Sequence, residues 1–184
     1  MLTLEIDITE IEKNLSSLEK SLDFVLVENR RIVRLCSNSI KAMHSKNLFE
    51  AKKNLSEAKE LLEPLKKFYP DFSNHIDHIY QEYSEAIVVL SAIESKSIPS
   101  LKSLDIPQIP YLLGLLDSVG ELKREMYEEL RIGRKKEATE YFKLMELIFD
   151  SLLPLRFSNA ILPDFRRKQD VARSQIEQAR GELI

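Results

Sequence analysis

Glycine and proline are placed so that most of this chain can form only long helices. The sequence has 4 glycines and 7 prolines in 184 residues, and residues 1–63 contain neither. Both residues interrupt helices, so a long stretch without them allows a helix of many turns. The prolines stand between stretches in which apolar residues recur every three or four positions, the period of a helix. This distribution predicts an all-α fold.

The apolar spacing divides the chain into an antiparallel bundle of about six helices. The first helix is expected to run to about Ser45, with an apolar stripe of Leu15, Leu18, Leu22, Leu26, Val33 and Ile40. The others are expected at about 48–68, at about 72–95, from just after Pro110, at about 134–153, and from just after Pro163. The stretch 98–110 is expected to be the longest non-helical connection. We expect one domain, residues 1–184, because the chain is too short for two comfortable cores.

Composition excludes several classes of protein. No apolar run approaches the roughly 20 residues of a membrane-spanning helix, and the acidic start MLTLEIDITE lacks the basic region of a secretory signal. We therefore expect a cytoplasmic protein. Cys36 is the only cysteine, which excludes an internal disulfide or a thiolate zinc site, and we expect it in the core. The net charge of −3 argues against a wholly basic nucleic-acid coat but allows a local basic surface.

Two acidic pairs are the main candidates for chemistry. At about 100° per residue, Glu82 and Glu85 share an arc of roughly 80° with His75 and His78. Asp117 and Glu121, on the next long helix, are about 40° apart. Each set taken alone is typical of the solvated face of a packed helix. The histidines are most simply surface residues, because a di-iron bundle needs Glu-x-x-His in each half and no histidine follows Asp117.

If the two acidic pairs converged in space, a metal-binding role would become more plausible than two solvated helix faces. If the two helices pack side by side and antiparallel, four carboxylates point into one pocket and raise one another's pKa unless a divalent cation compensates them. Oxygen-only ligands suit Mg²⁺ or Mn²⁺ better than zinc. Such an ion can support hydrolysis of a phosphodiester. From the residues alone, solvated faces and a metal site both stay open.

Three segments resemble the translin family, and specifically compact prokaryotic-type members of its Trax-like branch. They are QEYSEA (81–86), YLLGLLDSVGELKRE (111–125) and LRFSNAILPDFRRKQDVARSQIEQARGEL (155–183), and the resemblance spans roughly residues 30–183. It implies a translin-like helical bundle that forms a hollow, octamer-like homo-oligomer and binds single-stranded nucleic acid. Trax-type members also cleave RNA with Mg²⁺. By position, their catalytic carboxylates match Glu82, Glu85, Asp117 and Glu121; translin-type subunits, which bind without cleaving, lack the full set.

Basic residues give a weaker signal. The segment ENRRIVRLCSNSIKAMHSK places a basic cluster on the first helix: Arg30, Arg31, Arg34, Lys41, His44 and Lys46. These residues do not share one tight arc, so ordinary solvated charges remain an alternative. Under the resemblance, some of them and Arg124 would hold phosphates near the metal. The RRK segment at 166–168 is expected to cap the last helix or contact another subunit.

The sequence therefore predicts a Mg²⁺-dependent endoribonuclease, with Mn²⁺ as an alternative ion, that cleaves single-stranded RNA within a homo-oligomer. The predicted catalytic and metal-binding residues are Glu82, Glu85, Asp117 and Glu121, and single-stranded DNA is a further candidate ligand. One alternative is a translin-like scaffold that binds single-stranded RNA or DNA without cleaving it. A second is an all-α nucleoside triphosphate pyrophosphohydrolase, although its usual Glu-x-x-Glu and Glu-x-x-Asp pair differs from Asp-x-x-x-Glu here. A third is a purely structural bundle.

Overall fold

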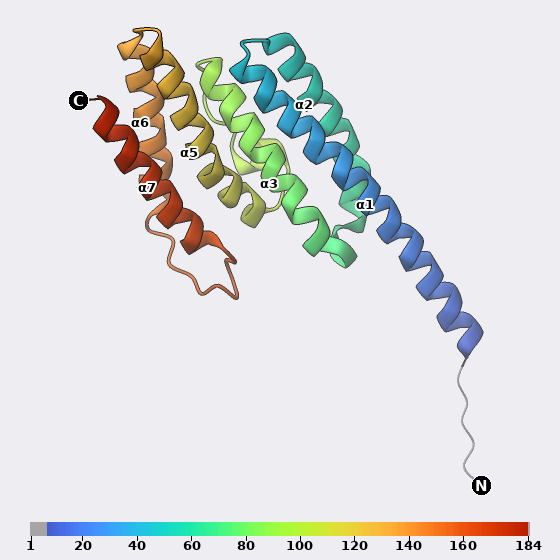
Figure 1. The fold of residues 1–184 in the computed structure, drawn as a ribbon. Coiled ribbons are helices and arrows are strands. Elements are labelled where there is room, and N and C mark those ends of the chain that lie inside the picture. The colour runs from blue at the N-terminus through green and yellow to red at the C-terminus, as the bar shows by residue number, and fades with distance from the viewer. Residues whose placement is uncertain (1–6, 184) are drawn as a thin grey trace.

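The computed structural model describes residues 7–183, and within them the chain forms six long helices, a short helix and a stretch of 3₁₀ helix (Figure 1). The elements are α1 (Ile8–His44), α2 (Leu48–Leu62), η1 (Glu63–Phe68), α3 (Tyr69–Ile93), α4 (Leu101–Leu104), α5 (Gln108–Arg131), α6 (Lys135–Leu152) and α7 (Phe165–Leu183). No strand occurs in this range. The predicted all-α bundle of about six helices is confirmed. Residues 1–6 of the acidic start lie outside the described residues.

Side-chain caps and prolines set several helix ends. The Asp7 carboxylate accepts a hydrogen bond from the Glu10 amide at the start of α1, which satisfies an N–H group that has no partner inside the helix. The expected helix over 48–68 is instead α2 followed by η1, which has Pro64 in its first turn. The stretch 98–110 is not wholly non-helical, since it contains α4 and the first turn of α5, which includes Pro110. Proline is tolerated in a first turn because its missing N–H would be unpaired there.

The two acid-bearing helices run parallel, so the expectation that they pack antiparallel was wrong. Early in each helix, Gly114 of α5 faces Gln81 of α3, and near their ends Glu129 and Ile93 line a common cavity. The reason is the connection 94–107, which returns along the bundle before α5 begins (Figure 1). Helices α1, α3, α5 and α7 all point the same way, and α2 and α6 run in the opposite direction (Figure 1).

The apolar side chains form two cores that meet between α3 and α5. One core is built by α1, α2, η1 and α3, and the other by α5, α6 and α7 with Val88 of α3. Gly114 lets the two helices approach closely, because a Cβ atom there would lie 2.6 Å from both the Gln81 carbonyl oxygen and the Ser84 Cβ. Ser84 is itself buried and small, and its hydroxyl donates to the Tyr80 carbonyl. The functional candidates lie along this seam.

The apolar face of α1 differs from the predicted stripe. Val25, Ile32, Cys36 and Met43 face the core, which confirms the expected position of Cys36. Leu15 is 60% exposed, and Leu18 and Leu26 are also exposed. The start of α1 extends beyond the other helices (Figure 1), and its apolar residues Ile8, Ile11 and Leu15 are exposed within residues 7–183. Periodicity marks an apolar face without saying which partner covers it.

Candidate functional site

The four predicted carboxylates line one cavity of about 460 Å³ between α3, α5 and α7. The convergence that the sequence only suggested is therefore present. The lining residues are His78, Gln81, Glu82 and Glu85 from α3, Leu116, Asp117, Gly120 and Glu121 from α5, and Arg167, Lys168, Val171 and Gln175 from α7. Spacings of three and four residues put each acidic pair on one face of its helix. The close approach at Gly114 then brings the two faces together.

The carboxylates on α5 are held by side chains from three other helices. Asp117 accepts a hydrogen bond from Gln81 Nε2 of α3 at 2.7 Å and an ion-paired one from Lys168 Nζ of α7 at 2.5 Å. Glu121 Oε2 lies 2.5 Å from His44 Nε2 at the end of α1. Both α5 carboxylates are therefore fixed and neutralised within the chain.

His44 joins Glu121 to a buried carboxylate. Its Nδ1 atom lies 2.6 Å from Glu125 Oε1, and Glu125 is fully buried. Burial alone would lower the pKa of His44, but the hydrogen bonds with Glu121 and Glu125 outweigh it and raise that pKa to about 9. Burial would raise the pKa of Glu125, but hydrogen bonds from His44 and Lys46 outweigh it and lower that pKa. The two carboxylate contacts thus favour the protonated form of His44.

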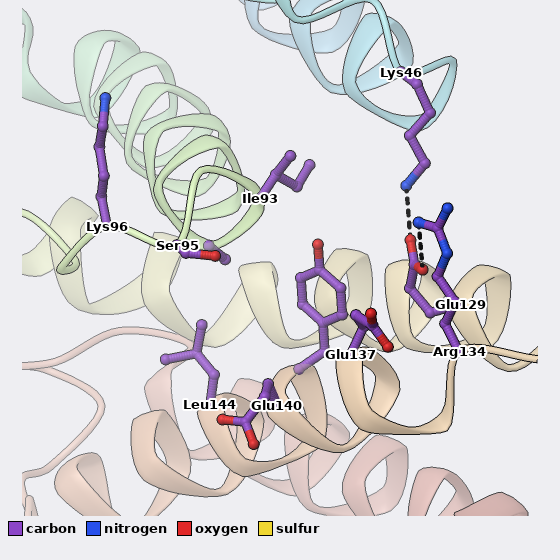
Figure 2. A pocket seen from close by; sticks show the side chains of 11 residues that line it. Lys46, Ile93, Ser95, Lys96, Glu129, Arg134, Glu137, Glu140 and Leu144 are labelled. Atoms are coloured by element: carbon purple, nitrogen blue, oxygen red, sulfur yellow. Dashed lines mark hydrogen bonds and ion pairs between the residues drawn. The ribbon is translucent and has the colours of Figure 1, made fainter.

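The charged network continues to a second cavity of about 510 Å³. Lys46 Nζ lies 2.7 Å from Glu125 Oε2 and 3.2 Å from Glu129 Oε1. In Figure 2, the side chains of Lys46, just after α1, and Arg134, just before α6, both point toward Glu129. Lys96, a third cation at this cavity, is ion-paired with Glu94. The basic side chains at this cavity, Lys46, Lys96 and Arg134, are each ion-paired with a glutamate, which reduces the attraction of the cavity for an anionic ligand.

The carboxylates on α3 are far less compensated. Among residues 7–183, Glu85 has no hydrogen bond or ion pair, and Glu82 has only the exposed His78, whose Nδ1 is 3.8 Å from Glu82 Oε1. Burial, followed by the negative charges of Asp117 and Glu82, raises the pKa of Glu85 to about 8. Burial also raises the pKa of Glu82, with Asp117 adding and His78 opposing. The upward shift of both pKa values agrees with the expected repulsion between carboxylates, although burial is the larger cause of the shift.

The donor set fits a hard divalent cation in chemistry but is not assembled around one point. Within residues 7–183, no three His, Cys, Asp or Glu side chains are grouped closely enough to hold a metal ion. Lys168 and His44 form ion pairs with the α5 carboxylates Asp117 and Glu121, respectively. The donors are oxygen atoms only, and Glu85 is a partly buried carboxyl without a partner among residues 7–183, which a cation such as Mg²⁺ would satisfy. The residues able to hold such an ion are Glu82, Glu85, Asp117 and Glu121.

The predicted nucleic-acid residues lie outside this cavity. Arg30, Arg31, Arg34, Lys41 and Arg124 are all exposed, and none of them lines it. The basic groups at the cavity are instead Arg167 and Lys168 of the RRK segment. Sequence reasoning assigned that segment to capping or subunit contact, so its place beside Asp117 was missed. The contact of His44 with Glu121 was also missed, because no local pattern links residues 77 positions apart.

Comparison with known proteins defines the class of this protein. Residues 5–179 match the Translin family, and the chain therefore belongs to that family. The match argues against the pyrophosphohydrolase alternative. Within the described residues, no helix is both long and apolar enough to cross a membrane.

Individual relatives agree with this assignment. MJ0175, an uncharacterized protein of Methanocaldococcus jannaschii, is 32% identical over 164 residues, which cover 87% of this chain and 73% of the relative. The crystal structure of AfC3PO is similar with a TM-score of 0.90 and 30% identity, over 97% of this chain and 95% of that one. AfC3PO in complex with duplex RNA gives a TM-score of 0.89 and 29% identity over the same shares. Apo-NeC3PO is similar with a TM-score of 0.88 and 26% identity, over 99% of this chain and 98% of that one. The predicted translin-like fold is confirmed.

Proposed function

We propose that this chain is a Trax-like, Mg²⁺-dependent endoribonuclease that cleaves single-stranded RNA, with Mn²⁺ as an alternative ion. The observation that supports the proposal is that carboxylates from two helices meet in one cavity, where Glu85 is partly buried and, within residues 7–183, has no hydrogen-bond or ion-pair partner. Such a carboxyl loses part of its solvation without gaining a partner, and a bound cation would supply one. All four acidic positions of the Trax-like motif are present.

The residues of the cavity have complementary roles in this proposal. Glu82, Glu85, Asp117 and Glu121 would hold the ion. When bound, Mg²⁺ would lower the pKa of water and offset negative charge on the phosphodiester. Arg167 and Lys168 of α7 line the same cavity as the acidic side chains of α3. Their positive charges would attract and orient the phosphate backbone, which is the usual role of such residues in nucleic-acid binding.

RNA is the ligand class that the comparisons favour. One structural relative, AfC3PO, was solved in complex with duplex RNA. We extend RNA binding to this chain, with single-stranded RNA as the substrate and single-stranded DNA as a further ligand. The exposed arginines and lysines of α1, Arg30, Arg31, Arg34 and Lys41, with Arg124, remain candidates for contacts to phosphates outside the cavity.

The test is cleavage of one labelled RNA sequence in single-stranded and duplex form, with Mg²⁺ or with EDTA. We expect cleavage of the single strand only with Mg²⁺, and loss of cleavage in Glu85→Gln. Glu57→Gln, an exposed acidic position on α2, is the matched control and should cleave normally. Equal cleavage with EDTA, or full activity in Glu85→Gln, would overturn the proposal.

A non-catalytic translin-like scaffold is the second candidate. It is favoured by the ion pair between Lys168 and Asp117 and by the absence, within residues 7–183, of a grouped ligand set. A scaffold binds single-stranded RNA equally well with Mg²⁺ and with EDTA and releases no cleaved product in either. Measurement of binding by fluorescence anisotropy beside the cleavage assay separates the two functions.

The homo-oligomer is supported by the uncovered apolar face of α1. Ile8, Ile11 and Leu15 line one shallow surface on its exposed first half. Exposed apolar patches of this kind mark protein–protein contacts. We propose an octamer-like closed assembly that uses this face. Leu15→Glu should lower the mass measured by light scattering, and Lys13→Glu, on the opposite side of the helix, should not. An unchanged mass in Leu15→Glu would exclude this face as the interface.

A further inference from the structure

One of the four cavity carboxylates is connected to the interior of the bundle. Glu121 lines the cavity, but its Oε2 atom is taken by His44 Nε2, which comes from the end of α1. No hydrogen bond to Glu121 Oε1 is found within residues 7–183. One oxygen is therefore anchored, and the other is the atom left to meet a ligand in the cavity.

The imidazole that anchors Glu121 cannot easily turn. Both of its nitrogens are engaged, Nε2 with Glu121 and Nδ1 with Glu125. The His44 side chain is only 6% exposed, so water cannot replace either partner without opening the packing around it. Because both ring nitrogens are hydrogen-bonded, the imidazole has one orientation and its Nε2 atom has a fixed position.

The second partner of His44 is fixed in turn. Glu125 is fully buried, and its other oxygen accepts from Lys46 Nζ at 2.7 Å. Lys46 also contacts Glu129, which Arg134 approaches from the turn after α5 (Figure 2). A continuous series of hydrogen bonds and ion pairs thus links Glu121, His44, Glu125, Lys46 and Glu129. The anchoring of Glu121 begins two helical turns away from the cavity.

Stability alone gives a weak reason for this arrangement. Buried ion pairs lose solvation on folding, and apolar residues of similar size are often as stabilising in their place. Groups behind a metal-binding side chain, by contrast, orient the ligand, and their loss typically weakens metal affinity or activity about 10–100-fold. The position of His44, between a cavity carboxylate and a buried anchor, matches that second arrangement.

We propose that His44 is a positioning residue that holds the Glu121 carboxylate in place for a divalent cation, with Glu125 as its anchor. This inference rests on the proposed function, since it needs the cavity to bind the ion. His44 does not line the cavity. Its effect on catalysis passes through Glu121 alone.

The test measures Mn²⁺ affinity, from the electron paramagnetic resonance signal of free Mn²⁺, together with kcat and KM for RNA cleavage. We expect His44→Phe to weaken Mn²⁺ affinity and lower kcat by about 10-fold or more, with KM for RNA unchanged. In a Glu121→Gln background the same change should cause no further loss, because the two residues act as one unit. His75→Phe, an exposed histidine outside the cavity, is the matched control.

The outcomes separate this inference from the proposed function. If the wild-type protein neither binds Mn²⁺ nor cleaves RNA, the proposed function fails and the inference with it. If the wild type does both and a folded His44→Phe variant keeps the wild-type Mn²⁺ affinity and kcat, only the inference is overturned. The inference is also overturned if the losses caused by His44→Phe and Glu121→Gln are additive in the double variant. Should His44→Phe fail to fold, the pair His44→Leu with Glu125→Leu removes both buried charges together and carries the same expectations.

Discussion

The carboxylates of α3 and those of α5 share a cavity, but the protein treats them differently. Asp117 and Glu121 of α5 are tied to Gln81, Lys168 and His44. Glu85 of α3 has no such partner within the described residues, and its pKa is raised to about 8 by burial and by the neighbouring acids. The α5 pair is already neutralised and fixed, whereas the α3 pair is held in a site that disfavours its own charge. The difference indicates which side chains an added cation would stabilise most.

The two pairs should nevertheless be equally necessary for cleavage, and this is the largest expected effect. Glu85→Gln and Asp117→Asn should each reduce Mg²⁺-dependent RNA cleavage by more than the roughly 10–100-fold typical of residues that only support a ligand. The physical reason is that each change removes one negative oxygen from the proposed ion site. Single-turnover rates at saturating RNA provide the measurement.

The same two variants should differ in stability without metal. Asp117→Asn leaves Lys168 without its anionic partner, so it should unfold at a lower temperature than wild type in EDTA. Glu85→Gln breaks no hydrogen bond or ion pair among residues 7–183 and should not. If both variants lost the same stability, the contrast between the two pairs would be wrong.

Gly114→Ala tests whether the close approach of α3 and α5 creates the cavity. The new Cβ would meet the Gln81 carbonyl oxygen and Ser84 Cβ at 2.6 Å, so the helices must move apart. Overpacking of this kind typically costs about 1–3 kcal/mol. Urea unfolding gives the free energy, and the cleavage rate should fall with it. Gly181→Ala in α7 is the control, since nothing lies within 4 Å of its Cβ; equal stability of the two variants would contradict the tight contact.

The stability of Glu85→Gln relative to wild type should depend on pH in the absence of divalent ions. The folded-state pKa of Glu85, about 8, lies above the ordinary value of 4.5, so folded protein binds the proton more tightly and loses stability as pH rises through this window. Glutamine imitates the protonated form and should be more stable than Glu85 by several kcal/mol, on the order of 4–5, at pH 9. At pH 4.5 the two should be nearly equal. A difference that shrinks with rising pH would reverse the sign and reject the assignment.

Lys168→Gln should have the smallest effect. Lys168 competes with an added cation for Asp117, so its removal should tighten Mg²⁺ binding a few-fold, within the about 1 kcal/mol that a partly exposed ion pair contributes. The rise in melting temperature on adding Mg²⁺, without RNA, reports the change. Arg166→Gln, in the same basic segment but outside the cavity, is the matched control. Unchanged or weaker Mg²⁺ stabilisation in Lys168→Gln would show that Lys168 does not compete for this site.

Local patterns accounted for much of the helical structure. The run without glycine or proline predicted α1, and the apolar residues of α3, among them Ile76, Ile79 and Tyr83, are buried as expected. Helical spacing also placed each acidic pair on one face. These predictions succeed because helix formation and helix faces depend on residues within a few positions of one another. Helix ends near Pro64 and Pro110 were less well predicted, since proline permits both an end and a first turn.

Local residue spacing was enough to predict an all-helical protein with two acidic pairs at helical spacing, and the motifs were enough to predict the translin family. Long-range packing makes α3 and α5 run parallel, brings Lys168 and Gln81 to Asp117, and brings His44 to Glu121. These contacts join residues between 36 and 77 positions apart. The return of residues 94–107 along the bundle and the contact at Gly114 set the direction and depth of packing. That packing, rather than any local spacing, determines which charges are paired.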